Sequence, residues 1–299
     1  MKKPLLGLLI SLATGLSCLG ADLHIGFSAE FFEGINQTDA MAAMKVWSES
    51  VATSRGITIN SHAKVYKDCE ELGAALRADK VDLLVVLSHQ MIALRDQGLL
   101  DPEFVSLRNG NPSENYLLLV HRDGGISNIA DLGQKAVVVQ SNARASLGER
   151  WFKHLMAEQG IEESRFPVVT EASKVSKVVL PVFFKKADAC LVTRNGYGIL
   201  CEFNPQLAKQ LVVLTESPGF VPTSICFRSN YKSEIHGDLI AGLSELHLEP
   251  RGQQVLMLFK VDALQDYDAA LMENVEELLG NGPPGSSDAR ALAVKEQDE

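Results

Sequence analysis

The segment from Ser141 to Ser146, which reads SNARAS, carries the residue types best suited to hold an anion. Ser141 and Asn142 are good N-terminal caps for the helical pattern that follows them. The free N–H groups of a first helical turn and the helix dipole attract negative charge. Arg144 adds a guanidinium whose fork fits carboxylate or phosphate oxygens. The segment therefore predicts an anion-binding loop, with a plain capped helix and a solvated arginine as the alternative.

Further candidate residues follow other predicted strands, because in open α/β sheets a ligand lies beyond the carboxyl ends of the strands. Arg194 follows a buried strand, where a side chain tends to point into a cleft; a surface arginine is the alternative. Lys174 and Lys177 begin a predicted helix, where positive charge opposes the helix dipole, so a ligand-binding role gains weight. The aromatic candidates could instead pack within a lobe, and His89 could be structural. The candidate ligand-binding residues are Phe31, Phe32, Ser88, His89, Ser141, Asn142, Arg144, Ser146, Lys174, Ser176, Lys177, Thr193, Arg194 and Tyr197.

The sequence contains none of the common motifs for metal binding or catalysis. No Cys-x-x-Cys pair or Cys/His cluster has the spacing of a zinc site, and no His-Glu-x-x-His, P-loop or dinucleotide-binding glycine pattern occurs. The run from Arg144 to Gly148 is loosely similar to a nucleophile elbow, but the first glycine of that motif is absent. We therefore predict no catalytic residue, no metal site and no cofactor, with an exported hydrolase as the alternative.

Length and charge narrow the class of protein. The chain has 299 residues, of which 46% are hydrophobic and 22% charged, as in an ordinary globular protein with room for two lobes. Its 28 Lys and Arg against 38 Asp and Glu give a formal net charge of −10. A chain this acidic is a poor candidate for binding nucleic acid, which needs a basic face. A small anionic ligand stays compatible with this charge, because a single cleft can be locally positive.

Residues 1–21 have the pattern of a secretory signal peptide. Two lysines precede an apolar segment from Leu5 to Leu16, and small residues suited to cleavage follow it. No later apolar run reaches the ~18 residues of a membrane span, so we expect an exported, soluble protein of the periplasm. A short membrane anchor and a lipoprotein attached at Cys18 are the alternatives. The other cysteines, whose even number permits disulfides in an oxidising compartment, are Cys69, Cys190, Cys201 and Cys226.

Apolar runs alternate with helical patterns along the chain, which indicates an α/β fold. The run Val81–Leu87 (VDLLVVL) is continuously apolar, as is typical of a strand buried on both faces of a parallel sheet. The other predicted strands are 23–27, 57–66, 116–121, 135–140, 166–170, 189–192 and 223–228. Two predicted helices span 69–78 and 177–186. Two more are predicted from residues that recur at helical spacing and form one apolar face: Ala40, Met44, Trp47 and Val51 in one, and Leu147, Trp151 and Leu155 in the other.

The pattern divides into two similar α/β lobes. In both halves, at 78–88 and at 185–193, a helix end, an Asp and an apolar strand are followed by a hydroxyl residue. We expect the strands at 116–121 and 223–228 to be the two crossovers between the lobes. The predicted domains are a discontinuous first lobe (22–119 plus 221–280), a second lobe (120–220) and a flexible tail (281–299).

Three stretches resemble the substrate-binding proteins of ABC transporters, within the branch that binds phosphate, phosphite and phosphonate. They are 81–100, 115–146 and 177–199, and the segment 123–135 (DGGISNIADLGQK) is the most specific part. The resemblance implies a type II periplasmic-binding-protein fold, whose two lobes close on a small oxyanion for delivery to an ABC permease. It also implies that the anion's oxygens are held by Ser141, Asn142, Ala143, Arg144, Ala145 and Ser146.

The sequence departs from this family in two places. Arg144 stands in a segment where the family has more hydroxyl residues, and Thr193 and Arg194 stand where aminophosphonate binders carry an acid. We therefore expect a phosphonate- or phosphate-like anion or an organic acid as the ligand, rather than an amine-bearing phosphonate. The expected protein partner of this monomer is an ABC permease. A periplasmic sensor that presents its ligand-bound form to a membrane signalling protein is the alternative.

Overall fold

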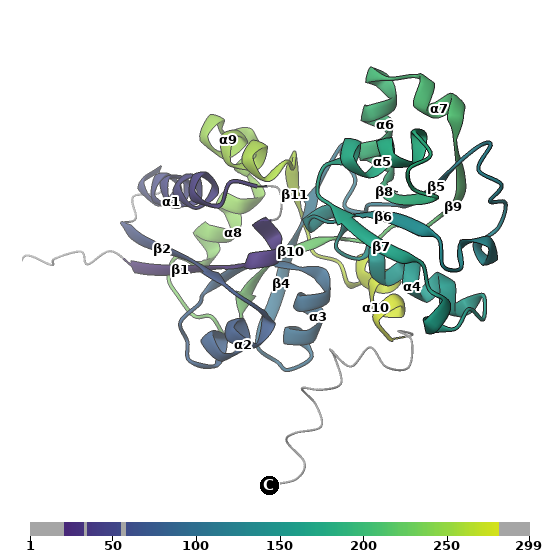
Figure 1. Cartoon of the computed structure of the whole chain (residues 1–299). Helices are drawn as coiled ribbons and strands as arrows, with labels where there is room; N and C mark the ends of the chain where they lie inside the picture. Colours follow the sequence, from purple (N-terminus) through teal and green to yellow (C-terminus); the bar gives the residue numbers. More distant parts are fainter. Residues whose placement is uncertain (1–20, 33–34, 55–57, 281–299) are drawn as a thin grey trace, which may run out of the picture.

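The computed structural model describes residues 21–32, 35–54 and 58–280. The described chain forms two α/β lobes, each built on one sheet (Figure 1). This arrangement confirms the fold class that the alternation of apolar runs and helical patterns predicts. The predicted signal peptide up to residue 20, which includes Cys18, and the predicted tail 281–299 lie outside the described residues.

The first lobe contains a six-stranded mixed sheet. Its strands are β1 (Ala21–Ser28), β2 (Ile59–Tyr66), β3 (Leu83–Leu87), β4 (Leu100–Leu107), β10 (Thr223–Arg228) and β11 (Ala263–Asp266). Their order is β11-β4-β10-β3-β1-β2. β1 is parallel to β2 and β3, whereas β10 is antiparallel to β3 and β4, and β11 is antiparallel to β4. Two separate parts of the sequence therefore assemble this sheet.

Helices cover both faces of the first sheet, because its central strands are apolar on both faces. The helices are α1 (Gln37–Ser54), α2 (Cys69–Arg77), α3 (Ser88–Arg95), α8 (His236–Ser244) and α9 (Pro250–Phe259). Successive side chains of a strand point to opposite faces. In β3, Leu83 and Leu87 belong to one buried cluster with residues of α1, α8 and α9, whereas Leu84 and Val86 belong to another with residues of α2 and α3. This double burial explains the continuous apolar run in the sequence.

The second lobe contains a five-stranded sheet in the order β7-β6-β8-β5-β9. The strands are β5 (Tyr116–His121), β6 (Ala136–Gln140), β7 (Val168–Ala172), β8 (Ala189–Thr193) and β9 (Leu211–Glu216). β6 is parallel to β7 and β8, and β5 is antiparallel to β8 and β9. The helices are α4 (Gly148–Glu158), α5 (Val175–Phe183), α6 (Arg194–Phe203) and α7 (Gln206–Gln210). Buried residues of α5 pack with Val138 and Cys190, and those of α4 with Val139 and Leu191, so the two helices cover opposite faces.

Some elements differ from the sequence-based expectation. Strands β4, β9 and β11, helices α3, α6, α7, α8 and α9, and a last helix at Glu273–Gly280 have no counterpart among the predicted elements. The helix predicted for 177–186 is α5, which starts at Val175 and ends at Phe183. It ends early because Lys185 has a φ of 56°, in the left-handed region that stops a right-handed helix.

Two connecting segments, 108–115 and 217–222, join the sheets. They pair with each other, since Glu114 N donates to Phe220 O (2.9 Å) and Phe220 N donates to Glu114 O (3.0 Å). The strands expected as crossovers lie at the ends of these segments: β5 belongs to the second sheet and β10 to the first. The two segments that connect the lobes are thus joined to each other by a single antiparallel bridge.

The segment 123–135, the most family-like part of the sequence, forms a turn and a 3₁₀ helix (Ile129–Leu132) before β6. The Asp131 carboxylate accepts hydrogen bonds from Ser127 N (2.8 Å) and Asn128 N (3.1 Å), and Asn128 Oδ1 accepts one from Asp131 N (3.2 Å). These backbone donors lower the pKa of Asp131. The aspartate of the motif therefore fixes the turn that leads into the second lobe's sheet.

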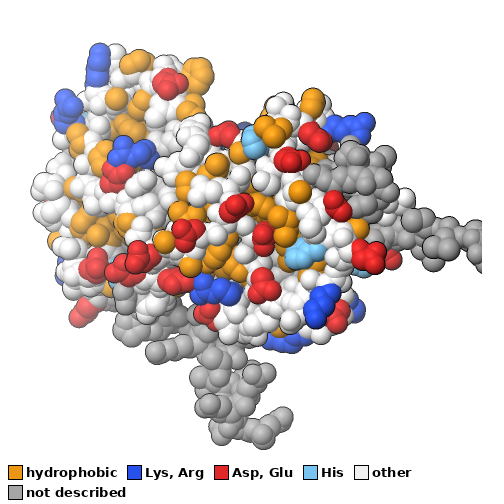
Figure 2. Space-filling view, turned by 180° about the vertical axis from the view of Figure 1, so that it is seen from behind, with side chains coloured by type: hydrophobic (Ala, Val, Ile, Leu, Met, Phe, Trp, Pro, Cys, Tyr) orange, Lys and Arg blue, Asp and Glu red, His pale blue; other side chains and the backbone are white. Residues whose placement is uncertain are grey.

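The four cysteines of the described residues are free thiols, and two of them, Cys190 and Cys226, are buried. Cys69, Cys190, Cys201 and Cys226 are free, so none of the disulfides that their number permits is present in this part of the chain. Within the described residues, no helix combines the length and apolar content that crossing a membrane requires. Seen from behind, Asp and Glu side chains are spread over both lobes (Figure 2), in keeping with the net charge.

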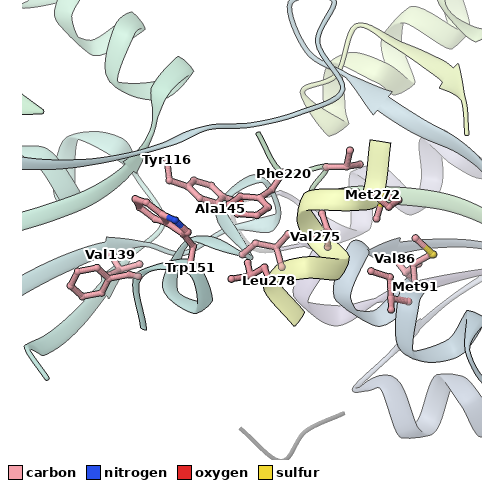
Figure 3. Close-up of a cluster of buried hydrophobic side chains, with 14 of the residues drawn as sticks. Val86, Met91, Tyr116, Val139, Ala145, Trp151, Phe220, Met272, Val275 and Leu278 are labelled. Atoms are coloured by element: carbon pink, nitrogen blue, oxygen red, sulfur yellow. The ribbon is translucent and has the colours of Figure 1, made fainter. Parts of the chain in front are cut away.

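A last helix, α10 (Glu273–Gly280), lies between the two lobes (Figure 3) and packs against α3 and α4. One buried cluster spans both lobes and this helix, and it includes Val86, Met91, Tyr116, Trp151, Phe220, Met272, Val275 and Leu278. Glu276 pairs with Arg95 of α3 at 2.7 Å, and Asn274 Nδ2 donates to Gly219 O of a connecting segment at 2.9 Å. The end of the described chain therefore closes the core at the junction of the lobes.

Candidate functional site

A cavity of about 460 Å³ lies between the lobes, beside the last residues of β6 and β8, Gln140 and Thr193. From the first lobe its wall includes Phe31 and the end of α9 with Phe259; from the second lobe it includes one face of α6. Gln140 and Thr193 are joined, because Thr193 N donates to Gln140 Oε1 at 3.0 Å. The cavity thus occupies the position, beyond strand carboxyl ends, where α/β sheets bind ligands.

The charged groups that line this cavity are basic. They are Arg108, Arg144, Lys174 and Lys260, and no Asp or Glu among the described residues lines it. Lys174 precedes α5, and its side chain is exposed. The cavity is therefore locally positive on a protein whose net charge is −10. Such a lining favours an anionic ligand, because opposite charges attract most strongly where water is displaced.

Arg144 is held at the base of the cleft by a buried ion pair. Its Nε donates to Glu114 Oε2 at 3.2 Å, and the two side chains are 11% and 4% exposed. Its Nη1 donates to Ser106 Oγ at 3.4 Å, and that hydroxyl is 2.7 Å from Thr223 Oγ1. Burial lowers the pKa of Arg144, and the Glu114 carboxylate opposes this effect. The network joins the second lobe to a connecting segment and to strands of the first lobe.

Ser141 and Asn142 are predicted to cap the helix that carries Trp151, and the structure places that cap differently. Asn142 Oδ1 accepts from Arg144 N (3.0 Å) and Ala145 N (3.2 Å), which caps a short 3₁₀ helix, Ala143–Ala145, while α4 begins later, at Gly148. Ser141 N donates to Ala172 O of β7 at 3.1 Å. Several N–H groups of the predicted anion loop therefore already have partners within the protein.

A second cavity of about 140 Å³ adjoins the first and shares Gln140 and Asn142 with it. Its other polar and charged lining residues are Glu30, Ser141, Ser146, Glu149 and Glu171. Ser146 Oγ is buried with no hydrogen-bond partner among the described residues. The cleft region thus has a basic larger part and an acidic smaller part.

Of the candidate residues, the structure brings one group together around the larger cavity. Those that line it are Phe31, Asn142, Arg144, Lys174, Ser176 and Thr193. Ser141 and Ser146 line only the smaller cavity. Ser88 begins α3 and is fully buried, and its backbone N–H donates to Pro222 O at 3.0 Å. His89 Nε2 lies 3.6 Å from Glu30 Oε2, next to the smaller cavity's rim.

The remaining candidates lie elsewhere. Lys177 lines a separate hollow on the outer side of α5. Arg194 pairs with Glu216 of β9, with Nε 2.6 Å from Oε1, and does not line the cleft. Tyr197 is partly buried and packs against the cluster that includes α5, and this burial raises its pKa. The ring of Phe32 packs on Phe27, with 5.3 Å between the centroids.

Several cleft residues are absent from the set of candidates drawn from the sequence: Arg108, Gln140, Ile199, Phe203, Phe259 and Lys260. Gln140 has a recognisable signal, because it is a polar residue that ends the apolar run KAVVVQ. The others come from segments whose strands or helices the sequence pattern does not reveal. Within the described residues, no group of three or more His, Cys, Asp or Glu side chains could hold a metal ion.

Comparison with known proteins gives a family and a fold. The family described as ABC transporter, phosphonate, periplasmic substrate-binding protein matches residues 35–271. None of the curated protein sequences matches this chain.

Solved structures share the fold at low sequence identity. XAC2383 from Xanthomonas citri bound to ATP has 15% identity and a TM-score of 0.67, over 88% of this chain and 97% of that one. A binding protein component of an ABC phosphonate transporter from Pseudomonas aeruginosa has 16% identity and a TM-score of 0.59, over 92% and 94%. PhnD1 from Prochlorococcus marinus in complex with methylphosphonate has 12% identity and a TM-score of 0.57, over 86% and 96%.

Proposed function

The chain belongs to the family of periplasmic substrate-binding proteins of phosphonate ABC transporters, and from this premise we propose that its interlobe cleft binds a small anion. The ligand class is a phosphonate, a phosphate or an organic acid, and the protein delivers it to an ABC permease. Residues 1–21 export the protein to the periplasm in this proposal. The observation that carries it is the basic lining of the larger cavity: Arg108, Arg144, Lys174 and Lys260 line it, and no Asp or Glu among the described residues does. Glu114, which pairs with Arg144, lies outside the lining.

The four basic residues come from different elements, so bringing the lobes together concentrates their charge. Arg108 lies in a connecting segment and Lys260 at the end of α9, whereas Arg144 and Lys174 belong to the second lobe. An anion between them would be attracted from both sides. Its binding energy would then favour the closed arrangement, because a ligand shifts a conformational equilibrium by its difference in affinity for the two states. The connecting segments 108–115 and 217–222 are the natural site of bending.

Lys174 and Lys177 provide a matched test. Both are exposed lysines at the start of α5, but Lys174 lines the cleft and Lys177 lines the outer hollow. We propose isothermal titration of the purified mature protein with inorganic phosphate, methylphosphonate, ATP and dicarboxylates. Lys174→Ala should weaken binding of the tightest anion about tenfold, the effect of losing roughly 1.4 kcal/mol, and Lys177→Ala should leave it within about twofold.

Two results would count against the proposal. The first is that wild-type protein binds none of these anions at millimolar concentration. The second is that Lys174→Ala and Lys177→Ala bind equally well, because then the cleft lysine makes no contribution and the anion binds elsewhere. Raising the salt concentration should weaken binding, since screening reduces charge attraction at a site open to solvent.

A further inference from the structure

The lining of the larger cavity is apolar as well as basic, and its apolar residues form two walls, one from each lobe. In α6 the residues that line it are Gly196, Ile199, Leu200 and Phe203. Their spacing of i, i+3, i+4 and i+7 places them on one face of the helix. From the opposite lobe, the rings of Phe31 and Phe259 line the cavity with centroids 5.4 Å apart. Two apolar walls from different lobes therefore bound the same space.

The face of α6 is exposed at an energetic disadvantage. Phe203 is 84% exposed, the largest exposed fraction among the exposed large hydrophobic residues described. Keeping apolar surface in water is unfavourable by roughly 25 cal/mol per Å², so an apolar helix face turned toward a ligand cavity is best explained by an apolar group that covers it. Neither the acidic net charge of the protein nor the basic lining of the cavity accounts for an apolar helix face at this place.

The apolar face of α6 leads away from the part of the cavity that Arg144 and Thr193 line. Arg144 and Thr193 lie at its base, where Arg144 is held by Glu114 and Thr193 ends β8. α6 starts immediately after Thr193, and ten residues of helix at about 1.5 Å each place Phe203 roughly 15 Å along the axis. A ligand with its anionic group at the base would extend its other end along the apolar face of α6.

The size of the cavity agrees with this orientation. At about 460 Å³ it falls within the range of about 300–1,000 Å³ that holds drug-sized ligands. Inorganic phosphate or methylphosphonate, with only a handful of non-hydrogen atoms, would fill a small part of it and would not reach the exposed ring of Phe203. Resting on the proposed function, we therefore infer that the ligand of this cleft is an organic anion with an aromatic or bulky apolar body.

The test compares anions that share a head group and differ in body. The mature protein is titrated with inorganic phosphate, methylphosphonate, phenylphosphonate and 4-phenylbutylphosphonate. We expect the dissociation constant to fall by at least about tenfold from methylphosphonate to the tighter of the two aromatic compounds. The reason is that burying the ligand's aromatic ring is more favourable than burying its methyl group. Phe203→Ala should remove most of this gain and leave the affinity for inorganic phosphate within about twofold.

Phe184→Ala is the matched control. Phe184 is 60% exposed, also lies in the second lobe and does not line the cleft, so its replacement should change none of the four dissociation constants. The inference is overturned if the aromatic phosphonates bind no more tightly than methylphosphonate. It is also overturned if Phe203→Ala weakens phosphate and aromatic phosphonates equally, because Phe203 then packs against the first lobe on closure instead of contacting a ligand body. In both cases binding of phosphate leaves the proposed function intact; loss of binding for every anion would remove both.

Discussion

Replacing Glu114 by Gln should destabilise the protein strongly, because it leaves the guanidinium of Arg144 buried without a counter-charge. The atoms of the pair are 3.2 Å apart, and the side chains are almost fully buried. At an effective dielectric constant of about 20, unit charges at that distance attract by about 5 kcal/mol. Desolvation offsets part of this attraction, and removing one partner of a buried pair costs about 3–5 kcal/mol. We expect a loss of this size for Glu114→Gln and for Arg144→Met.

The assay is a double-mutant cycle, with urea unfolding of wild type, both single variants and the double variant at pH 7. The double variant should lose clearly less stability than the sum of the single losses, by about 2 kcal/mol or more, because no unpaired charge remains in it. The exposed pair Arg194–Glu216 is the matched control, since Arg194 is 58% exposed. Its cycle, with Arg194→Met and Glu216→Gln, should give a coupling below about 1 kcal/mol.

Additive losses in the Glu114–Arg144 cycle, within about 0.5 kcal/mol, would refute this reasoning. A loss below about 1 kcal/mol for Glu114→Gln alone would do the same. Either result would mean that water or a rearranged neighbour solvates Arg144 at the base of the cleft.

Three further predictions concern the turn, the junction and the thiols. Asp131→Ala should lower the melting temperature at neutral pH. Because folding lowers the pKa of Asp131, the carboxylate stabilises the fold above its unfolded pKa of about 3.9, and this stabilisation is lost as the pH falls through the folded pKa. Thermal scans of wild type and variant should therefore give the same melting temperature in strong acid. Met272→Ala should cost about 2–5 kcal/mol in urea unfolding because Met272 is fully buried at the lobe junction, whereas Met257→Ala, at an exposed position, should stay within about 0.5 kcal/mol; equal losses would contradict this. Burial raises the pKa of the Cys190 and Cys226 thiols, so both should react with a thiol reagent at pH 8 only after unfolding. Label found on either cysteine by mass mapping of the native protein would contradict this prediction.

The sequence predicts the buried strands well, because burial on both faces produces an unbroken apolar run. Val81–Leu87 contains β3, and Ala189–Val192 lies within β8. β4 lacks such a run: it contains Pro102, which pairs with Cys226 of β10 next to an irregularity in register. Proline has no N–H to donate and is tolerated in a sheet at such a place, so the sequence there is not typical of a strand although the strand lies inside the sheet.

The lining of the cleft is less predictable from the sequence. Whether a basic residue lines it depends on its ion-pair partner and on its position around a helix. Lys174 and Lys177 are three residues apart at the start of α5, yet one lines the cleft and the other the outer hollow. Arg194 follows a strand end as Arg144 does, but Glu216 at the end of β9, two strands away in the sheet, pairs with it. Glu114 is thirty residues from its partner Arg144. Only the tertiary arrangement decides which basic side chains line the cavity.

The position of β10 in the first sheet has a consequence for how the chain folds. β10 lies between β3 and β4, which precede it by more than a hundred residues, and the whole sheet of the second lobe is encoded in the interval. Until residues 223–228 are available, β3 and β4 both have an unpaired edge, and pairings across such sequence distances form slowly. The second lobe can complete its sheet from continuous sequence, whereas the first lobe must wait for residues 223–228, which follow the whole sheet of the second lobe. A chain with this topology keeps open strand edges in its first lobe until the second lobe has been synthesised.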